Sequence, residues 1–150
     1  AQLRDTQLVQ TLAASIQDEF LVNSKRLSDL ELVLTEVITN SIDHGILELD
    51  STIKKDPSGF ERFFVTRAAK LAELSSGYIE VSIDQPDHGA IRMVVKDSGG
   101  GFPYPTGQLS QMPDSLLLAY GRGLLIIQQL CLSVTHIGNG NCVVLEFSII

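Results

Sequence analysis

The sequence predicts an α+β fold, a two-layer α/β sandwich in which helices cover one face of a mostly antiparallel sheet. Apolar residues recur at helical spacing through most of the first 74 residues, and the period then changes to the alternation of strands. Glycine and proline turns separate the later strands. Helices followed by strands, each with one apolar face, are typical of such a sandwich.

Three helices are expected before the first strand. The first covers residues 6–20. The second opens at Ser28-Asp-Leu-Glu31, a capping-box pattern, and is expected to end at Gly45 after His44. The third spans residues 60–74, with an apolar stripe expected in the core. That stripe comprises Phe60, Phe64, Ala68 and Leu71.

Strands are expected at 78–83 and 90–95, and a final hairpin at 133–137 and 142–149. A short helix over 123–132 precedes that hairpin. Residues 103–120 hold three prolines and little periodicity, so they are expected to form a mobile loop.

Bulk properties narrow the class of protein. The chain has 150 residues, 44% of them hydrophobic, and a net charge of −7 with a pI near 4.8. This charge argues against nucleic acid as a partner. No apolar run approaches the ~20 residues of a membrane span, and Cys131 and Cys142 indicate buried, reduced thiols rather than a disulfide. We therefore expect one cytoplasmic domain over residues 1–150, excised from a longer protein.

The first segment of chemical interest is Glu36-Val-Ile-Thr-Asn40-Ser-Ile-Asp43-His44-Gly45. At helical spacing, Glu36, Asn40 and Asp43 fall within about 60° of one another. Five apolar residues take the opposite arc: Leu30, Val33, Leu34, Val37 and Ile38. The polar stripe is either the wall of a cavity or an ordinary solvated helix face.

The second segment is Asp97-Ser-Gly-Gly-Gly101-Phe102, directly after a strand. Consecutive glycines let the backbone approach a flat ligand, and Asp97 supplies a carboxylate acceptor. A flexible turn with a capping aspartate is the alternative.

The third segment is Gly121-Arg122-Gly123, which opens an apolar helix. A glycine-flanked helix start offers free N–H groups to a phosphate, although tight packing explains a lone G-x-G equally well. Arg122 is the only Lys or Arg after Lys96, and it stands where the helix dipole disfavours a cation. A bound anion would account for that placement.

Taken in this order, the three segments resemble the N, G1 and G2 boxes of the Bergerat-fold (GHKL) ATPase superfamily. T-E-V-I-T-N-S-I-D-H-G, D-S-G-G-G-F and G-R-G-L-L-I-I are most similar to the anti-sigma-factor serine kinases, as is the His-Gly pair after the N box. The resemblance covers roughly residues 28–149. It looks closest to the C-terminal kinase domain of receiver–phosphatase–kinase regulators.

The resemblance implies ATP and Mg²⁺ as cofactors and assigns roles by position. Glu36 would act as the catalytic base, and Asn40 would hold Mg²⁺ against the phosphates. Asp97 would receive the adenine amino group, and Phe102 would start an ATP lid over residues 103–120. The remaining nucleotide contacts would be Asp43, Gly99, Gly101, Gly121, Arg122, Gly123 and Leu124.

The implied activity is serine/threonine phosphorylation of a STAS-type anti-sigma-factor antagonist in partner switching. The resemblance also admits a sigma or anti-sigma factor as partner, and a homodimer. A catalytically silent ATP-binding switch and a histidine-kinase catalytic domain remain the alternatives. The sequence departs from the family at the last hairpin, where Asn141 stands in place of a nucleotide-contacting Thr. His88 and His136 are expected to be surface or packing residues.

Overall fold

The sheet contains five described strands in the order β1-β2-β5-β4-β3, and each neighbouring pair is antiparallel. The computed structural model describes residues 2–49, 59–100, 107–111 and 122–150. The strands are β1 (Ile79–Asp87), β2 (Ala90–Asp97), β3 (Gly107–Gln108), β4 (Ser133–Ile137) and β5 (Cys142–Ser148). The predicted α+β class and antiparallel sheet are confirmed.

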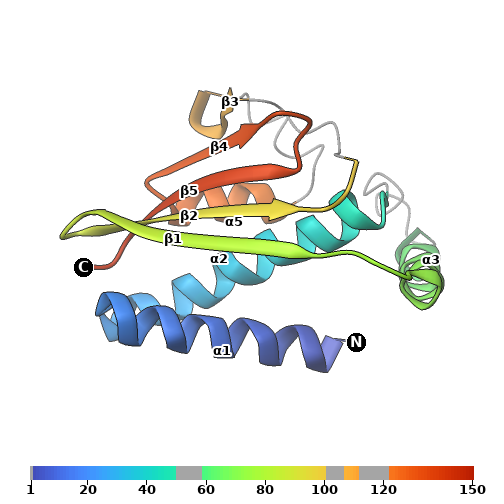
Figure 1. Cartoon of the computed structure of the whole chain (residues 1–150), viewed down its shortest axis with the longest axis horizontal. Helices are drawn as coiled ribbons and strands as arrows, with labels where there is room; N and C mark the ends of the chain where they lie inside the picture. Colours follow the sequence, from blue (N-terminus) through green and yellow to red (C-terminus); the bar gives the residue numbers. More distant parts are fainter. Residues whose placement is uncertain (1, 50–58, 101–106, 112–121) are drawn as a thin grey trace.

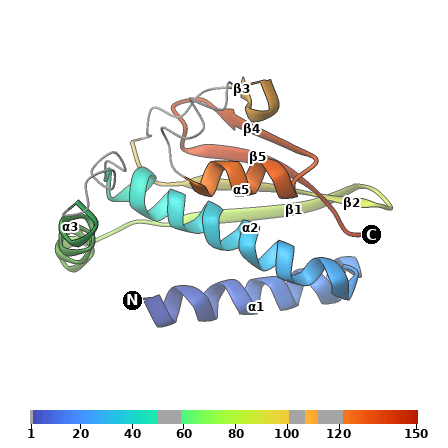
Figure 2. The same cartoon turned by 180° about the vertical axis from the view of Figure 1, so that it is seen from behind.

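Helices α1 (Gln2–Phe20), α2 (Leu27–Asn40) and α5 (Arg122–Leu130) cover one face of this sheet. Figure 1 looks onto the strands, and Figure 2 shows the helices from behind. Along β5, Val143, Leu145 and Phe147 are buried while the residues between them are half-buried. This alternation is expected for a sheet covered on one side.

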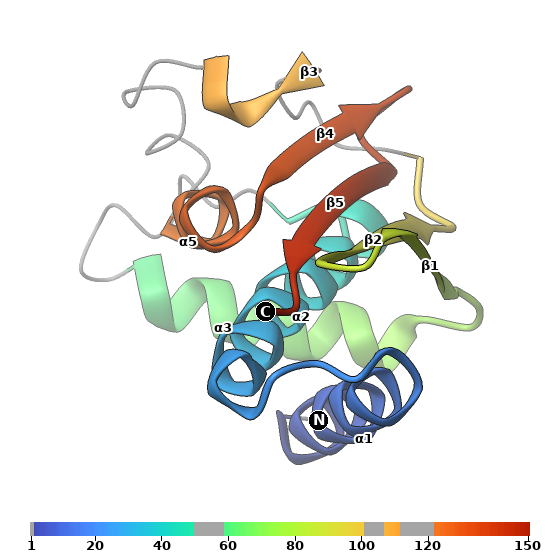
Figure 3. The ribbon, with the colours of Figure 1, turned by 90° about the vertical axis from the view of Figure 1, so that its left-hand side faces the viewer.

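Helix α2 lies at the centre of the helical layer, between α1 and α5 (Figure 3). The predicted apolar arc of this helix is confirmed, because all five of its residues are buried. They join buried side chains of α1, α5 and the sheet in one core.

The predicted capping box at the start of α2 is wrong. The chain enters α2 through a 3-10 turn, Ser24–Arg26, whose own cap is Asn23; its side chain accepts a hydrogen bond from the Lys25 N–H at 3.0 Å. Ser28 therefore lies inside the helix rather than at its end. Because the 3-10 turn leads directly into α2, the helical backbone begins before Ser28, and the Ser28 hydroxyl is not at a capping position.

The predicted end of this helix at Gly45 is also wrong. Beyond Asn40 the chain continues as a π-helical turn, η2 (Ser41–Ile46), in which the Leu47 N–H donates to the Ile42 carbonyl at 2.8 Å. Single π-helical turns of this kind are frequent at functional sites.

Helix α3 (Gly59–Glu73) packs at one end of the molecule, against the π-helical turn (Figure 1). The stripe expected to be buried is only partly right. Leu71 packs with Phe63, Leu47 and Leu49, but Phe64 is 51% exposed and Phe63 is the buried aromatic residue. The Phe60 side chain lies outside the described part. Phe63 joins Leu47 and Leu49 in a small second core, which selects a different face of the helix.

Part of the predicted mobile loop is ordered. Gly107 and Gln108 pair with His136 and Thr135 of β4, and a 3-10 turn, Leu109–Gln111, follows. The rest of residues 103–120 lies outside the described residues.

Cys131 and Cys142 are free and half-buried, and burial raises the pKa of the Cys131 thiol to about 12.

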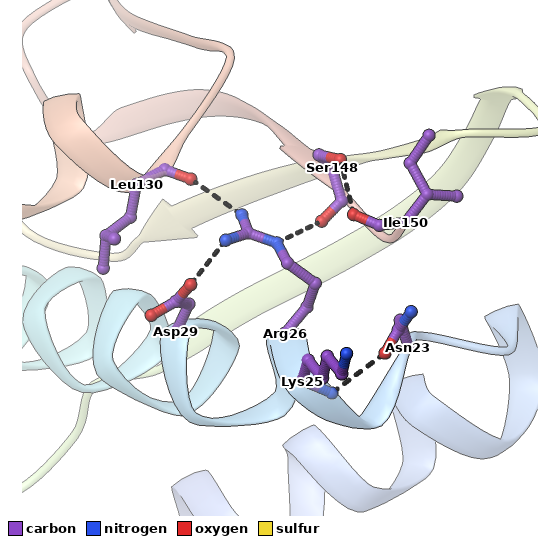
Figure 4. A network of polar contacts seen from close by, with 7 residues as sticks. All are labelled: Asn23, Lys25, Arg26, Asp29, Leu130, Ser148 and Ile150. Atoms are coloured by element: carbon purple, nitrogen blue, oxygen red, sulfur yellow. Dashed lines mark hydrogen bonds and ion pairs between the residues drawn. The ribbon is translucent and has the colours of Figure 1, made fainter.

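Arg26 ties the helical layer to the end of the sheet (Figure 4). Its guanidinium donates to the Ser148 carbonyl at 3.1 Å and to the Leu130 carbonyl at 3.3 Å, and it pairs with Asp29. It also lies 4.6 Å from the centre of the Phe147 ring.

Among the described helices, none is long and apolar enough to cross a membrane.

Candidate functional site

A cleft opens between the sheet and the helices α2 and α5. Asn40 of the first predicted segment and Asp97 of the second both line it. Val37, Val95, Ile127 and Val143 supply apolar surface, and Ser41, His136, Gly140, Asn141 and Cys142 complete the wall. Apolar walls with a few polar groups are typical of small-molecule sites.

The third segment meets the first at the start of α5. A side chain added at Gly123 would place its Cβ 2.5 Å from Glu36 Oε2 and 3.7 Å from Asn40 Nδ2. Glycine at this position therefore allows the Glu36 carboxylate to lie directly against the α5 backbone, with the Asn40 amide beside it. The helix start also presents its positive dipole end to this carboxylate.

Asp97 ends β2 at the opposite side of the cleft and is only 4% exposed. Its Oδ1 accepts the Gly99 N–H at 2.9 Å, and its own N–H donates to the Asn141 carbonyl at 2.9 Å. Burial raises the pKa of the Asp97 carboxyl, and the Gly99 hydrogen bond acts in the opposite direction. The carboxylate keeps further lone pairs for a ligand donor.

Two glycines let the π-helical turn touch this strand end. A Cβ at Gly45 would overlap the Asp97 carboxylate, lying 2.6 Å from Oδ1, and a Cβ at Gly99 would overlap the Gly45 carbonyl. From the sequence, Gly45 was expected only to end the helix. Its closeness to Asp97 depends on a contact between segments more than fifty residues apart, which no local pattern signals.

His136 is a second residue that sequence reasoning missed. It was expected to be a surface or packing residue; it is buried, at 7% exposure, and it also lines the cleft from β4, which was not expected. Burial lowers its pKa to about 4, so the imidazole is neutral at physiological pH. Its inward position follows from the strand alternation of β4 and from the pairing of β3 outside it.

The other predicted site residues lie in several places. Asp43 is buried at the π-helical turn and pairs with Arg67 of α3, outside the cleft lining. The 100° spacing ceases to apply where the helix widens at Ser41, so Asp43 leaves the Glu36–Asn40 stripe. The Leu124 side chain belongs to the core, and Arg122 is exposed at the first position of α5. Gly101, Phe102 and Gly121 lie outside the described residues.

These residues fit a purine nucleotide with magnesium. The buried Asp97 carboxylate suits an exocyclic amino group between apolar walls, and the Asn40 amide oxygen is a hard donor of the kind Mg²⁺ accepts. Within the described residues, no group of three or more His, Cys, Asp or Glu side chains could hold a metal ion alone. Mg²⁺ usually completes its coordination shell with phosphate oxygens and waters.

Comparisons with known proteins identify the family of this domain. The family model for the histidine kinase-like ATPase domain matches residues 64–147, more than half of the chain. No curated protein shows a significant match. Among solved structures, the histidine kinase domain of the blue-light activated histidine kinase from Erythrobacter litoralis EL346 is similar, with 15% identity and a TM-score of 0.47. The alignment covers 97% of this chain and 61% of that one, so the chain spans about three-fifths of that protein's length.

A helix-covered antiparallel sheet, with Asn40 and Asp97 on one cleft and Gly123 against Glu36 beside it, fits a GHKL-type ATP-binding domain. The chain belongs to the family of histidine kinase-like ATPase domains.

Proposed function

We propose that this domain is a Mg-ATP-dependent protein serine/threonine kinase that phosphorylates a STAS-type anti-sigma-factor antagonist in a cytoplasmic partner-switching pathway. The observation that carries the kinase activity is the meeting of Glu36 and Asn40 at Gly123. A proton acceptor and a metal-binding amide one helical turn apart, at a helix start suited to phosphate, match the parts that phosphoryl transfer needs.

The residues divide the chemistry between them. Asp97 and the apolar walls would hold the adenine base, Asn40 would hold Mg²⁺, and the start of α5 with Arg122 would bind the phosphates. Glu36 takes the proton of the acceptor hydroxyl while the hydroxyl oxygen forms a bond to the γ-phosphorus. The bond between that phosphorus and the bridging oxygen breaks, and the bridging oxygen leaves with ADP. ATP supplies the phosphoryl group when bound, and the associated Mg²⁺ neutralises its charge.

The choice of serine or threonine as acceptor is supported by the motif T-E-V-I-T-N-S-I-D-H-G, which is most similar to the anti-sigma-factor kinases. The same resemblance supports the STAS-type partner. A histidine-kinase catalytic domain and a silent switch make different chemical predictions, which one transfer experiment separates.

The test compares Glu36→Gln with Asn40→Ala in ATP binding and in transfer of radiolabelled phosphate to a STAS-domain antagonist. Glu36→Gln removes only the proton-accepting charge, so Mg-ATP binding should remain while transfer falls by about 10²–10⁴-fold. Asn40→Ala should lose metal-dependent binding and transfer together. Glu31→Gln, on the same helix, is the matched control and should transfer at the wild-type rate.

Each alternative has its own outcome. Near wild-type transfer by Glu36→Gln would remove the base assignment. A product that is acid-labile and labelled on histidine would place the domain with the histidine kinases. Mg-ATP binding without transfer to any antagonist would support the silent switch.

A further inference from the structure

Residues 41–49 form a wedge between helix α3 and the end of β2, and α3 holds one side of it. Arg67 Nε donates to Asp43 Oδ1 at 2.6 Å, and both side chains are largely buried, at 13% and 5% exposure. Lys70 Nζ donates to the Leu47 carbonyl at 2.9 Å. Phe63 packs with Leu47 and Leu49 in the second core. The described contacts of helix α3 with the wedge thus include an ion pair, a hydrogen bond and an apolar cluster.

The opposite side of the wedge touches the strand end that carries Asp97. Gly45 lies against the Asp97 carboxylate, and its carbonyl lies against Gly99. Glu48 Oε1 would be 3.4 Å from a Cβ at Gly100. A displacement of the wedge therefore displaces the backbone around the carboxylate that lines the cleft.

The wedge has a backbone that needs outside support. Residues Ser41–Ile46 are π-helical, a geometry that is rare as a free-standing structure. Glu48 adopts φ 53°, in the left-handed region that non-glycine residues seldom occupy. Conformations of this kind persist only where surrounding contacts over-determine them.

We propose that Arg67 is a positioning residue for recognition of the adenine base. By holding Asp43, it keeps the π-helical turn in place, and through Gly45 this turn keeps the Asp97–Gly99 strand end in the geometry that binds the nucleotide. This inference rests on the proposed function for its ATP readout. Helix α3 thereby becomes a determinant of nucleotide affinity although none of its described residues lines the cleft. Removing the guanidinium leaves a buried carboxylate that moves toward water and takes the turn with it.

The test uses Arg67→Met, which keeps side-chain length without charge, and Arg67→Lys, which restores the charge. Asp43→Asn is a nearly isosteric second variant in case Arg67→Met does not fold. Arg92→Met is the matched control, because it breaks an exposed Arg–Asp pair, at 3.1 and 2.6 Å from Asp84, in the distant β1–β2 hairpin. Arg26→Met, which weakens the fold elsewhere, controls for lost stability.

Two measurements are made on each folded variant. Amide hydrogen exchange in the nucleotide-free protein should rise selectively at residues 41–49 and 97–100 in Arg67→Met and Asp43→Asn. It should stay at the wild-type level in Arg92→Met, and any rise in Arg26→Met should not be confined to these two segments. Calorimetric affinity for Mg-ATP should fall roughly ten-fold in the same two variants, within the usual ~5–150-fold range of coupling between sites. Arg67→Lys should recover most of both effects.

The outcomes separate this inference from the proposed function. Unchanged exchange at 97–100 in Arg67→Met and Asp43→Asn overturns the coupling, whatever the ATP affinity. Raised exchange with wild-type ATP affinity overturns the role in base recognition. A wild-type protein that binds no ATP overturns the proposed function, while the exchange measurement still decides the coupling. An equal ATP loss in Arg26→Met would assign the effect to global stability and overturn the positioning role.

Discussion

Gly45 and Gly99 make the closest approach in the candidate site, since neither position has room for a side chain. Gly99 would place its Cβ onto the backbone carbonyl of Gly45, and backbone cannot move aside as a flexible side chain can. At Gly100, the next residue along the chain, an added Cβ would lie 3.4 Å from the end of the Glu48 side chain, its nearest neighbour among the described residues. The two neighbouring glycines therefore differ in what they tolerate.

We predict that Gly99→Ala destabilises the fold by about 1–3 kcal/mol, as overpacking usually does, and that it abolishes ATP binding. Gly100→Ala should stay close to wild type in both properties. Thermal unfolding and calorimetry with Mg-ATP measure the two effects. Equal behaviour of the two variants would contradict the close approach of Gly99 to the π-helical turn.

At the scale of elements, α2 and α5 meet where Glu36 lies against Gly123. The contact is with the far end of a flexible side chain, so an added methyl group would move the carboxylate rather than the helices. A substitution at Gly123 can therefore move the Glu36 carboxylate without disturbing the packing of α2 against α5.

We predict that Gly123→Ala keeps or slightly raises stability, because alanine favours a helix over glycine. Phosphoryl transfer should nevertheless fall by about 10²-fold, the lower end of what a general base contributes. Steady-state transfer rates and thermal unfolding of the same sample provide the check. A variant with wild-type turnover would show that the observed Glu36 position is not required.

At the scale of the whole molecule, two polar residues link the layers in different ways. Arg26 joins the start of α2, the end of α5 and the end of β5 through its guanidinium (Figure 4). His136 lies between the sheet and the helices, and burial holds its pKa near 4 rather than the ordinary 6.5. The cost of protonating that buried imidazole makes the stability of the fold depend on pH.

We predict that the free energy of unfolding falls by about 2 kcal/mol between pH 7 and pH 5 through His136 alone. Below pH 6.5 the unfolded chain gains a proton there that the folded protein refuses until about pH 4, so acid favours unfolding over that window. Denaturant titrations at several pH values in this range give the free energy of unfolding as a function of pH. This free energy should change less steeply with pH in His136→Gln than in the wild type. His88→Gln, at an exposed turn, should keep the wild-type slope.

The amino-acid sequence alone determined the class of fold, the order of the main helices and strands, and two of the segments that line the cleft. These features are written in short-range periodicity and in glycine placement, which depend on neighbours in the chain. The apolar arc of α2 is the clearest case, because all five predicted residues are buried. Asn40 and Asp97 likewise lie on one cleft, as the box order indicated.

Only the tertiary structure decided where Asp43, Gly45 and His136 lie. The widened turn after Asn40 breaks the angular rule that grouped Asp43 with Glu36, and α3 supplies Arg67 from 24 residues away. Gly45 is defined by Asp97 and Gly99, and His136 by the pairing of β4 on both sides. Such positions depend on contacts between distant segments, whose energies outweigh local preference and leave no periodic mark in the sequence.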